Sequence, residues 1–120
     1  MRMTVPSATE IAQASRFLTL IGNGKRILIL DIVSRNETSV GKLAFMVDMG
    51  QSALSQHLTI LKNAHLVQTR RDAQTIYYRS ESASVASILA VLYEILDIEV
   101  PAYRGVEGVD EPMVVELLRQ

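Results

Sequence analysis

Two short helical patterns joined by a tight turn constrain the fold of this chain more than any other feature. Apolar side chains recur at helical spacing over residues 40–47, and Ser39 is placed to cap the start of that helix. Residues 48–50 then form a turn signal, and a second apolar stripe follows over residues 51–61. The stripes consist of Val40, Leu43, Ala44 and Val47, and of Leu54, Leu58 and Leu61. Two such helices predict a helix-turn-helix.

The second of these helices exposes a polar face without formal charge. Its members are Gln51, Ser52, Ser55, Gln56 and Thr59. Ser and Gln side chains both donate and accept hydrogen bonds, and base edges in the major groove of DNA present both kinds of group. Carboxylates on the same face would repel phosphates. We therefore expect this face to read DNA, with a plain Ser/Gln-rich surface as the alternative.

After the second helix the pattern changes to that of strands. Residues 66–71 and 75–79 flank Asp72-Ala73-Gln74, which predicts a hairpin with Arg70 and Arg71 beside its tip. Residues 35–79 carry six basic and three acidic side chains, whereas residues 80–120 carry two basic and eight acidic ones. A basic patch is typical of nucleic-acid binding, and ordinary surface charge is an equal alternative.

Helical patterns also lie on both sides of this region. Ser7 and Glu10 have the spacing of a capping box, and the helix that they start ends near residues 22–24. A long helix is predicted from Ser84 to about residue 98, and Pro101 prevents it from continuing further. Its apolar face is wider than one stripe. Residues 25–35 fit a buried strand or a helix equally, and residues 111–118 predict a short helix in the tail.

Length and composition narrow the remaining classes. The chain has 120 residues, of which 48% are hydrophobic, so we expect one domain. There is no cysteine, which removes disulfides and thiolate metal sites. The N-terminus carries no signal-peptide pattern, and no run approaches the ~18 apolar residues of a membrane span, so we expect a cytoplasmic protein. No catalytic residue is expected, because Ser55 and His57 point to different sides of a helix and no G-x-S-x-G motif occurs.

The segment LAFMVDMGQSALSQHLTILKNAHLVQTRRDAQTIYYR resembles the helix-turn-helix and wing of the ArsR/SmtB family of bacterial transcriptional regulators. The likeness extends over about residues 10–98 and is closest to the metal-independent, NolR/HlyU-like branch. It implies a mainly α winged helix-turn-helix, in which four helices precede a small β-hairpin wing and a fifth helix follows. Residues 25–35 would then be a helix, residues 1–100 a DNA-binding and dimerisation domain, and residues 101–120 a C-terminal tail.

The resemblance also assigns residues to two surfaces. The DNA-binding residues that it implies are Ser39, Gln51, Ser52, Ser55, Gln56, His57, Arg70, Arg71 and Gln74. Among them, His57 would touch a phosphate or buttress the helix. The family forms homodimers through the first and last helices, which implies an interface of Ile11, Ala14, Phe17, Leu18, Ile88, Leu92, Ile95 and Leu96. The alternative is that both helices are buried in the core of their own subunit.

The chain departs from the sensing branches of the family. It lacks the thiolate cluster near residues 40–43, the histidines on the last helix, and the cysteine pair of the sulfur-sensing relatives. We therefore expect no metal and no cofactor, and a small-molecule effector stays open. The function expected is that of a dimeric repressor on a double-stranded, inverted-repeat operator, without a membrane partner. The alternative is a winged-helix protein-interaction module, antitoxin-like or an assembly factor.

Overall fold

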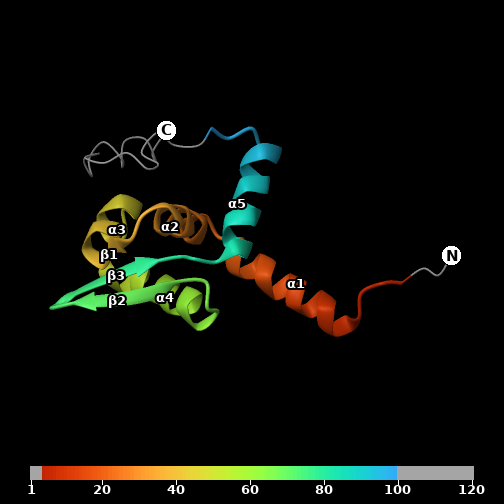
Figure 1. The fold of residues 1–120 in the computed structure, drawn as a ribbon, viewed down its shortest axis with the longest axis horizontal. Helices are drawn as coiled ribbons and strands as arrows, with labels where there is room; N and C mark the ends of the chain where they lie inside the picture. Colours follow the sequence, from red (N-terminus) through yellow and green to blue (C-terminus); the bar gives the residue numbers. More distant parts are fainter. Residues whose placement is uncertain (1–3, 100–120) are drawn as a thin grey trace.

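The computed structural model describes residues 4–99 and has the expected order of elements (Figure 1). The bounds are α1 Ala8–Ile21, α2 Gly24–Arg35, β1 Thr38–Ser39, α3 Val40–Val47, α4 Gln51–Asn63, β2 Gln68–Asp72, β3 Thr75–Arg79 and α5 Ala83–Ile95. Figure 1 shows the β2–β3 wing at one end of the molecule and α1 at the other. The predicted winged helix-turn-helix is confirmed, and the predicted tail with its short helix lies outside the described residues.

The helix starts lie where the capping signals place them. The Ser7 hydroxyl accepts from the backbone of Glu10 at 3.1 Å, and the Glu10 carboxylate accepts from the backbone of Ser7 at 2.8 Å. The side chains of Asn23 and Ser39 cap α2 and α3 by one bond each, which they accept from the backbone N–H groups of Arg26 and Lys42. Each cap satisfies a backbone N–H group that the first helical turn leaves without a partner.

Helix α2 is the central element of the core, which explains its ambiguous sequence pattern. Five consecutive residues, Ile29 to Val33, are buried, so that nearly the whole circumference of the helix is covered. A helix whose central segment is buried on every side loses the apolar periodicity that separates helix from strand. Residues from α3, α4, α5 and the loop after α4 complete the core around it.

The sheet has one strand more than the hairpin expected. Residues Thr38 and Ser39 form β1, which pairs antiparallel with β3, so that the order is β1-β3-β2. This short strand continues directly into α3. It therefore fixes the start of the helix-turn-helix to the base of the wing.

Three helices end in a turn that places one residue in the left-handed region. Asp48 has φ 55° after α3. His65 has φ 61° after α4, a backbone conformation that glycine commonly supplies at the C-terminal end of a helix. Asp97 has φ 54° after α5, and the backbone N–H of Ile98 donates to the Tyr93 carbonyl at 2.8 Å. The prediction that α5 continues to about residue 98 was wrong, because this hydrogen-bonded turn ends the helix at Ile95.

Candidate nucleic-acid interface

Helix α4 separates its apolar and polar residues as the sequence predicts. Leu54, Leu58 and Leu61 are buried against the core. Gln51, Ser52, Ser55 and Gln56 are all exposed. Gly50 caps the helix without a side-chain hydrogen bond. The N-terminal half of α4 thus presents backbone N–H groups and neutral polar side chains, which suits both phosphates and base edges.

A surface hollow brings three of the predicted DNA-binding residues together. Its volume is about 420 Å³, and it lies where the starts of α3 and α4 meet the wing. Ser39 comes from β1, where it caps the first helix of the motif; Gln51 comes from the second helix, and Gln74 from the hairpin turn. The other lining residues are Val40, Gly41, Thr75 and Ile76. Two helix N-termini at one hollow favour an anionic group such as a backbone phosphate.

The two wing arginines differ in their surroundings. Arg70 donates to the Glu37 carboxylate at 2.6 and 3.1 Å, and its guanidinium lies 4.5 Å from the centre of the Tyr77 ring. The hydrogen bond from Arg70 lowers the pKa of Glu37. Arg71 is exposed on the opposite face of the ribbon, because neighbouring strand residues point to opposite sides. Arg71 therefore carries the more accessible charge.

Sequence reasoning missed Glu37 as part of this surface. Its carboxylate lies 2.6 Å from Arg70 and 3.8 Å from Arg79, and both side chains belong to the wing strands. An acidic group thus occupies the base of the basic wing. Glu37 and Arg70 are 33 residues apart, so no local pattern signals their pairing.

His57 does not lie with the exposed polar face of α4. It is half-buried, and its Nδ1 atom lies 3.3 Å from the Nη1 atom of Arg26. Burial, Arg26 and Lys25 all lower the pKa of His57. A neutral imidazole that contacts another helix fits the buttressing role better than a phosphate contact.

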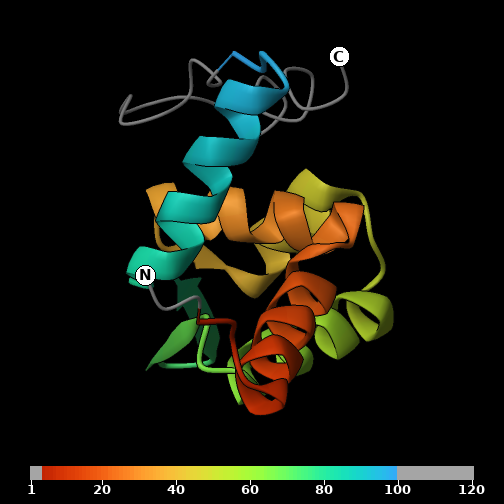
Figure 2. The same ribbon diagram turned by 90° about the vertical axis from the view of Figure 1, so that its right-hand side faces the viewer.

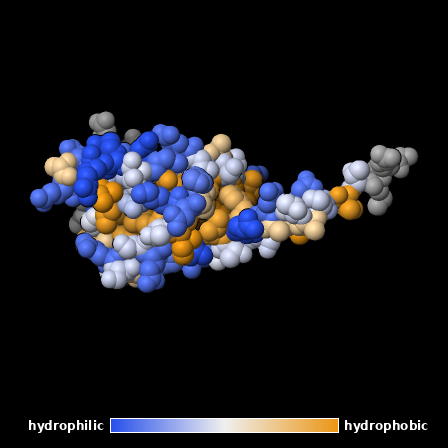
Figure 3. Space-filling model, turned by 90° about the horizontal axis from the view of Figure 1, so that it is seen from below, coloured by the Kyte–Doolittle hydropathy of each residue, from blue (hydrophilic) through white to orange (hydrophobic). Residues whose placement is uncertain are grey.

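The predicted dimer residues divide into two groups. Phe17, Ile88 and Leu92 are partly buried against the core of their own chain. The other five, Ile11, Ala14, Leu18, Ile95 and Leu96, are exposed. The exposed fractions reach 59% for Leu18 and 70% for Ile95. Figure 2 shows α5 in the upper part of the view and α1 in the lower part, and Figure 3 shows hydrophobic residues among hydrophilic ones along α1. A single subunit therefore leaves much of both helices uncovered.

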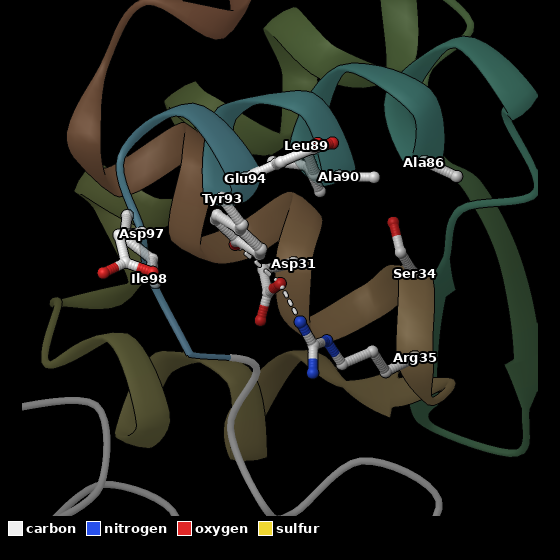
Figure 4. Close-up of a pocket in the computed structure, with 10 residues that line it drawn as sticks. All are labelled: Asp31, Ser34, Arg35, Ala86, Leu89, Ala90, Tyr93, Glu94, Asp97 and Ile98. Carbon is white, nitrogen blue, oxygen red and sulfur yellow. Dashed lines mark hydrogen bonds and ion pairs between the residues drawn. The ribbon is translucent and has the colours of Figure 1, made fainter.

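A second cavity, of about 460 Å³, lies between α2 and α5 (Figure 4). The Asp31 carboxylate accepts from Arg35 of the same helix and from the Tyr93 hydroxyl of α5, each at 2.7 Å. Ala86 and Ala90 supply small apolar side chains to the lining. Burial and the bond to Asp31 raise the pKa of Tyr93. This network joins the central helix of the core to α5.

Two classes of site find no support in residues 4–99. No group of three His, Cys, Asp or Glu side chains in this range is placed to hold a metal ion. Within the same range, no helix is both long and apolar enough to cross a membrane.

Comparison with known proteins gives a consistent result. Residues 23–69 match the family described as bacterial regulatory protein, arsR family. The nodulation protein NolR of Rhizobium meliloti is 52% identical over 91 residues, which cover 75% of each chain. The transcriptional activator HlyU of Vibrio cholerae is 39% identical over 84 residues, which cover 70% of this chain and 78% of HlyU.

Solved structures agree in fold. The crystal structure of NolR from Sinorhizobium fredii has a TM-score of 0.71 at 52% identity, and the match covers 79% of this chain and 96% of NolR. A solution structure from Mycobacterium bovis, described as a homodimeric winged helix-turn-helix DNA-binding domain, has a TM-score of 0.64 at 28% identity; 88% of this chain and all of that fragment are covered. The expected likeness to NolR and HlyU is confirmed, and the chain belongs to the ArsR family of bacterial transcriptional regulators.

Proposed function

We propose that this regulator, which is not an enzyme, acts as a homodimeric repressor on an inverted-repeat operator. Helix α4 enters the major groove, and the wing lies against the backbone or the minor groove. The observation that carries the proposal is the exposed, uncharged face of α4 beside the hollow lined by Ser39, Gln51 and Gln74. Bound across a promoter, such a dimer would exclude polymerase, and its work would take place in the bacterial cytoplasm.

The dimer is proposed to form through α1 and α5. The exposed apolar residues of these helices support it, because apolar patches that a monomer leaves in water are typical of interfaces. A two-fold axis would place the two α4 helices in successive major grooves, about 34 Å apart. Light scattering of the purified protein tests the stoichiometry.

We expect a small-molecule effector, where one acts, to bind in the cavity between α2 and α5. The cavity combines small apolar residues with the Asp31 carboxylate, the Arg35 guanidinium and the Tyr93 hydroxyl. A concave site with a few convergent polar groups is the usual form of a ligand pocket. Its position against α5 would connect it to the proposed dimer interface.

The first test is fluorescence anisotropy with DNA from upstream of the protein's own gene, with a scrambled duplex as reference. We expect the native duplex to be preferred by a factor of ~1000 or more. The double variant Ser55→Ala/Gln56→Ala should lose this preference and keep its fold. Asn63→Ala, exposed at the other end of α4, is the matched control and should bind as the wild type does.

Other outcomes have defined meanings. A double variant that keeps full operator affinity would contradict base reading by this face of α4. Equal, weak binding of both duplexes by the wild type would call for selection from random DNA. Failure of that selection would favour the protein-interaction module. Transcription in vitro from a promoter that contains the operator then distinguishes repression from activation.

A further inference from the structure

Arg26, in the first turn of α2, contacts two other helices. Its Nε atom donates to the Leu20 carbonyl at 2.7 Å, and its Nη2 atom donates to the Thr19 carbonyl at 3.2 Å. Both carbonyls belong to the last turn of α1. Its Nη1 atom lies 3.3 Å from Nδ1 of His57 on α4. Because a guanidinium can only donate, His57 accepts this bond as the neutral tautomer with its proton on Nε2.

The preceding residue makes an equivalent contact to a third helix. The Lys25 ammonium group donates to the carbonyl of Val47, the last residue of α3, at 2.5 Å. Neither α1 nor α3 carries a basic side chain in its own last turn. The start of α2 therefore supplies cations to the negative ends of two neighbouring helices.

The contact between Arg26 and His57 lies on the side of α4 that faces away from DNA in the proposed complex. Successive helical residues are about 100° apart, so His57 lies roughly opposite the face formed by Ser52, Ser55 and Gln56. Each of the three guanidinium nitrogens of half-buried Arg26 already has a protein acceptor. Arg26 is thus arranged to hold α4 from behind rather than to contact a phosphate.

We propose that Arg26 is a positioning residue: it fixes the orientation of the recognition helix α4 relative to α1, and so determines how well α4 reads base edges. The inference rests on the proposed function. Loss of the contact from Arg26 to His57 lets α4 shift, and base contacts depend on geometry more strongly than phosphate contacts do. Specific affinity should therefore fall while non-specific affinity is preserved.

Two kinds of variant test this. Arg26→Gln should lower affinity for the operator about tenfold or more, the effect of one misplaced base contact. Binding to the scrambled duplex and the slope of log K against log salt should stay unchanged. His57→Ala removes only the contact to α4 and leaves the end of α1 capped. It therefore tests the inference even if Arg26→Gln does not fold. His57→Asn, which keeps an acceptor near the position of Nδ1, should restore operator affinity.

Amide hydrogen exchange in the absence of DNA separates this inference from the proposed function. Exchange over residues 51–63 should accelerate in Arg26→Gln and in His57→Ala, but not in His57→Asn, while α5 stays protected. Unchanged exchange in α4 would overturn the positioning role. A uniform loss of binding to both duplexes with a shallower salt slope would also overturn it, because that pattern belongs to a phosphate contact. Faster exchange in α4, with a wild type that prefers no DNA sequence, would refute only the proposed function.

Discussion

The substitution Arg71→Ala isolates the electrostatic part of the DNA binding that we propose for the wing. Arg71 is exposed, and none of the ion pairs that the structure describes within residues 4–99 involves it. The substitution therefore removes one positive charge per subunit without removing such a contact. Arg16→Ala, which removes the same charge from the exposed surface of α1, is the matched control.

The size of the effect follows from counterion release. Each phosphate neutralised by a side chain contributes about 0.9 to the slope of log K against log salt. A homodimer with one Arg71 contact per subunit should lose about 1.8 from that slope. Between 50 and 200 mM salt, the affinity of the wild type should consequently fall about twelvefold more than that of Arg71→Ala.

The assay is anisotropy at four or five salt concentrations, with the operator and a scrambled duplex side by side. Both duplexes should show the same change in slope, because phosphates carry no sequence information. Arg16→Ala should leave both slopes unchanged. A wild-type slope in Arg71→Ala, or a loss confined to the operator, would refute the assignment of Arg71 to the backbone.

Further substitutions test the contacts around α4 and α5. Tyr93→Phe removes the hydroxyl that donates to Asp31, and urea denaturation should show a free energy of unfolding lower by about 1.5–3 kcal/mol; an unchanged midpoint would mean that the bond contributes nothing net. Because the pKa of His57 is lowered in the fold, the unfolded chain binds the proton at higher pH. The stability from His57 should be complete above pH about 6.5 and lost as the pH falls toward the lowered pKa, whereas His57→Asn should lack this decrease. Equal pH profiles of the two proteins between pH 5.5 and 7 would contradict it.

The parts of the fold that could be predicted are those with local signals. Ser39 caps the backbone of Lys42, three residues on, and the leucines of α4 repeat within one helix. The hairpin turn and the capping box of α1 are equally local. For α2, periodicity failed because burial all round removes it, and the resemblance to a known family decided between helix and strand.

The contacts that could not be predicted join residues that are distant in the chain. Glu37 and Arg70 are 33 residues apart, and Arg26 and His57 are 31 apart. A count of charged residues finds the arginines, but it cannot tell which of them form an ion pair with a carboxylate. For the same reason the sequence groups Arg70 with Arg71, and His57 with Gln56, although each pair faces different surroundings. The two-residue strand β1 was missed because pairing with β3, not local propensity, defines it.

The three groups of residues around α4 should give three different patterns of binding data. Loss of the proposed base contacts, as in Ser55→Ala/Gln56→Ala, should lower affinity for the operator alone. Loss of Arg71 should weaken binding to both duplexes and make the slope of log K against log salt shallower. Loss of Arg26 resembles the first pattern in DNA binding but differs from it in hydrogen exchange, because only Arg26 acts on α4 before DNA arrives. A single affinity at one salt concentration cannot separate these roles. Affinities for both duplexes at several salt concentrations, together with hydrogen exchange in α4, can separate them.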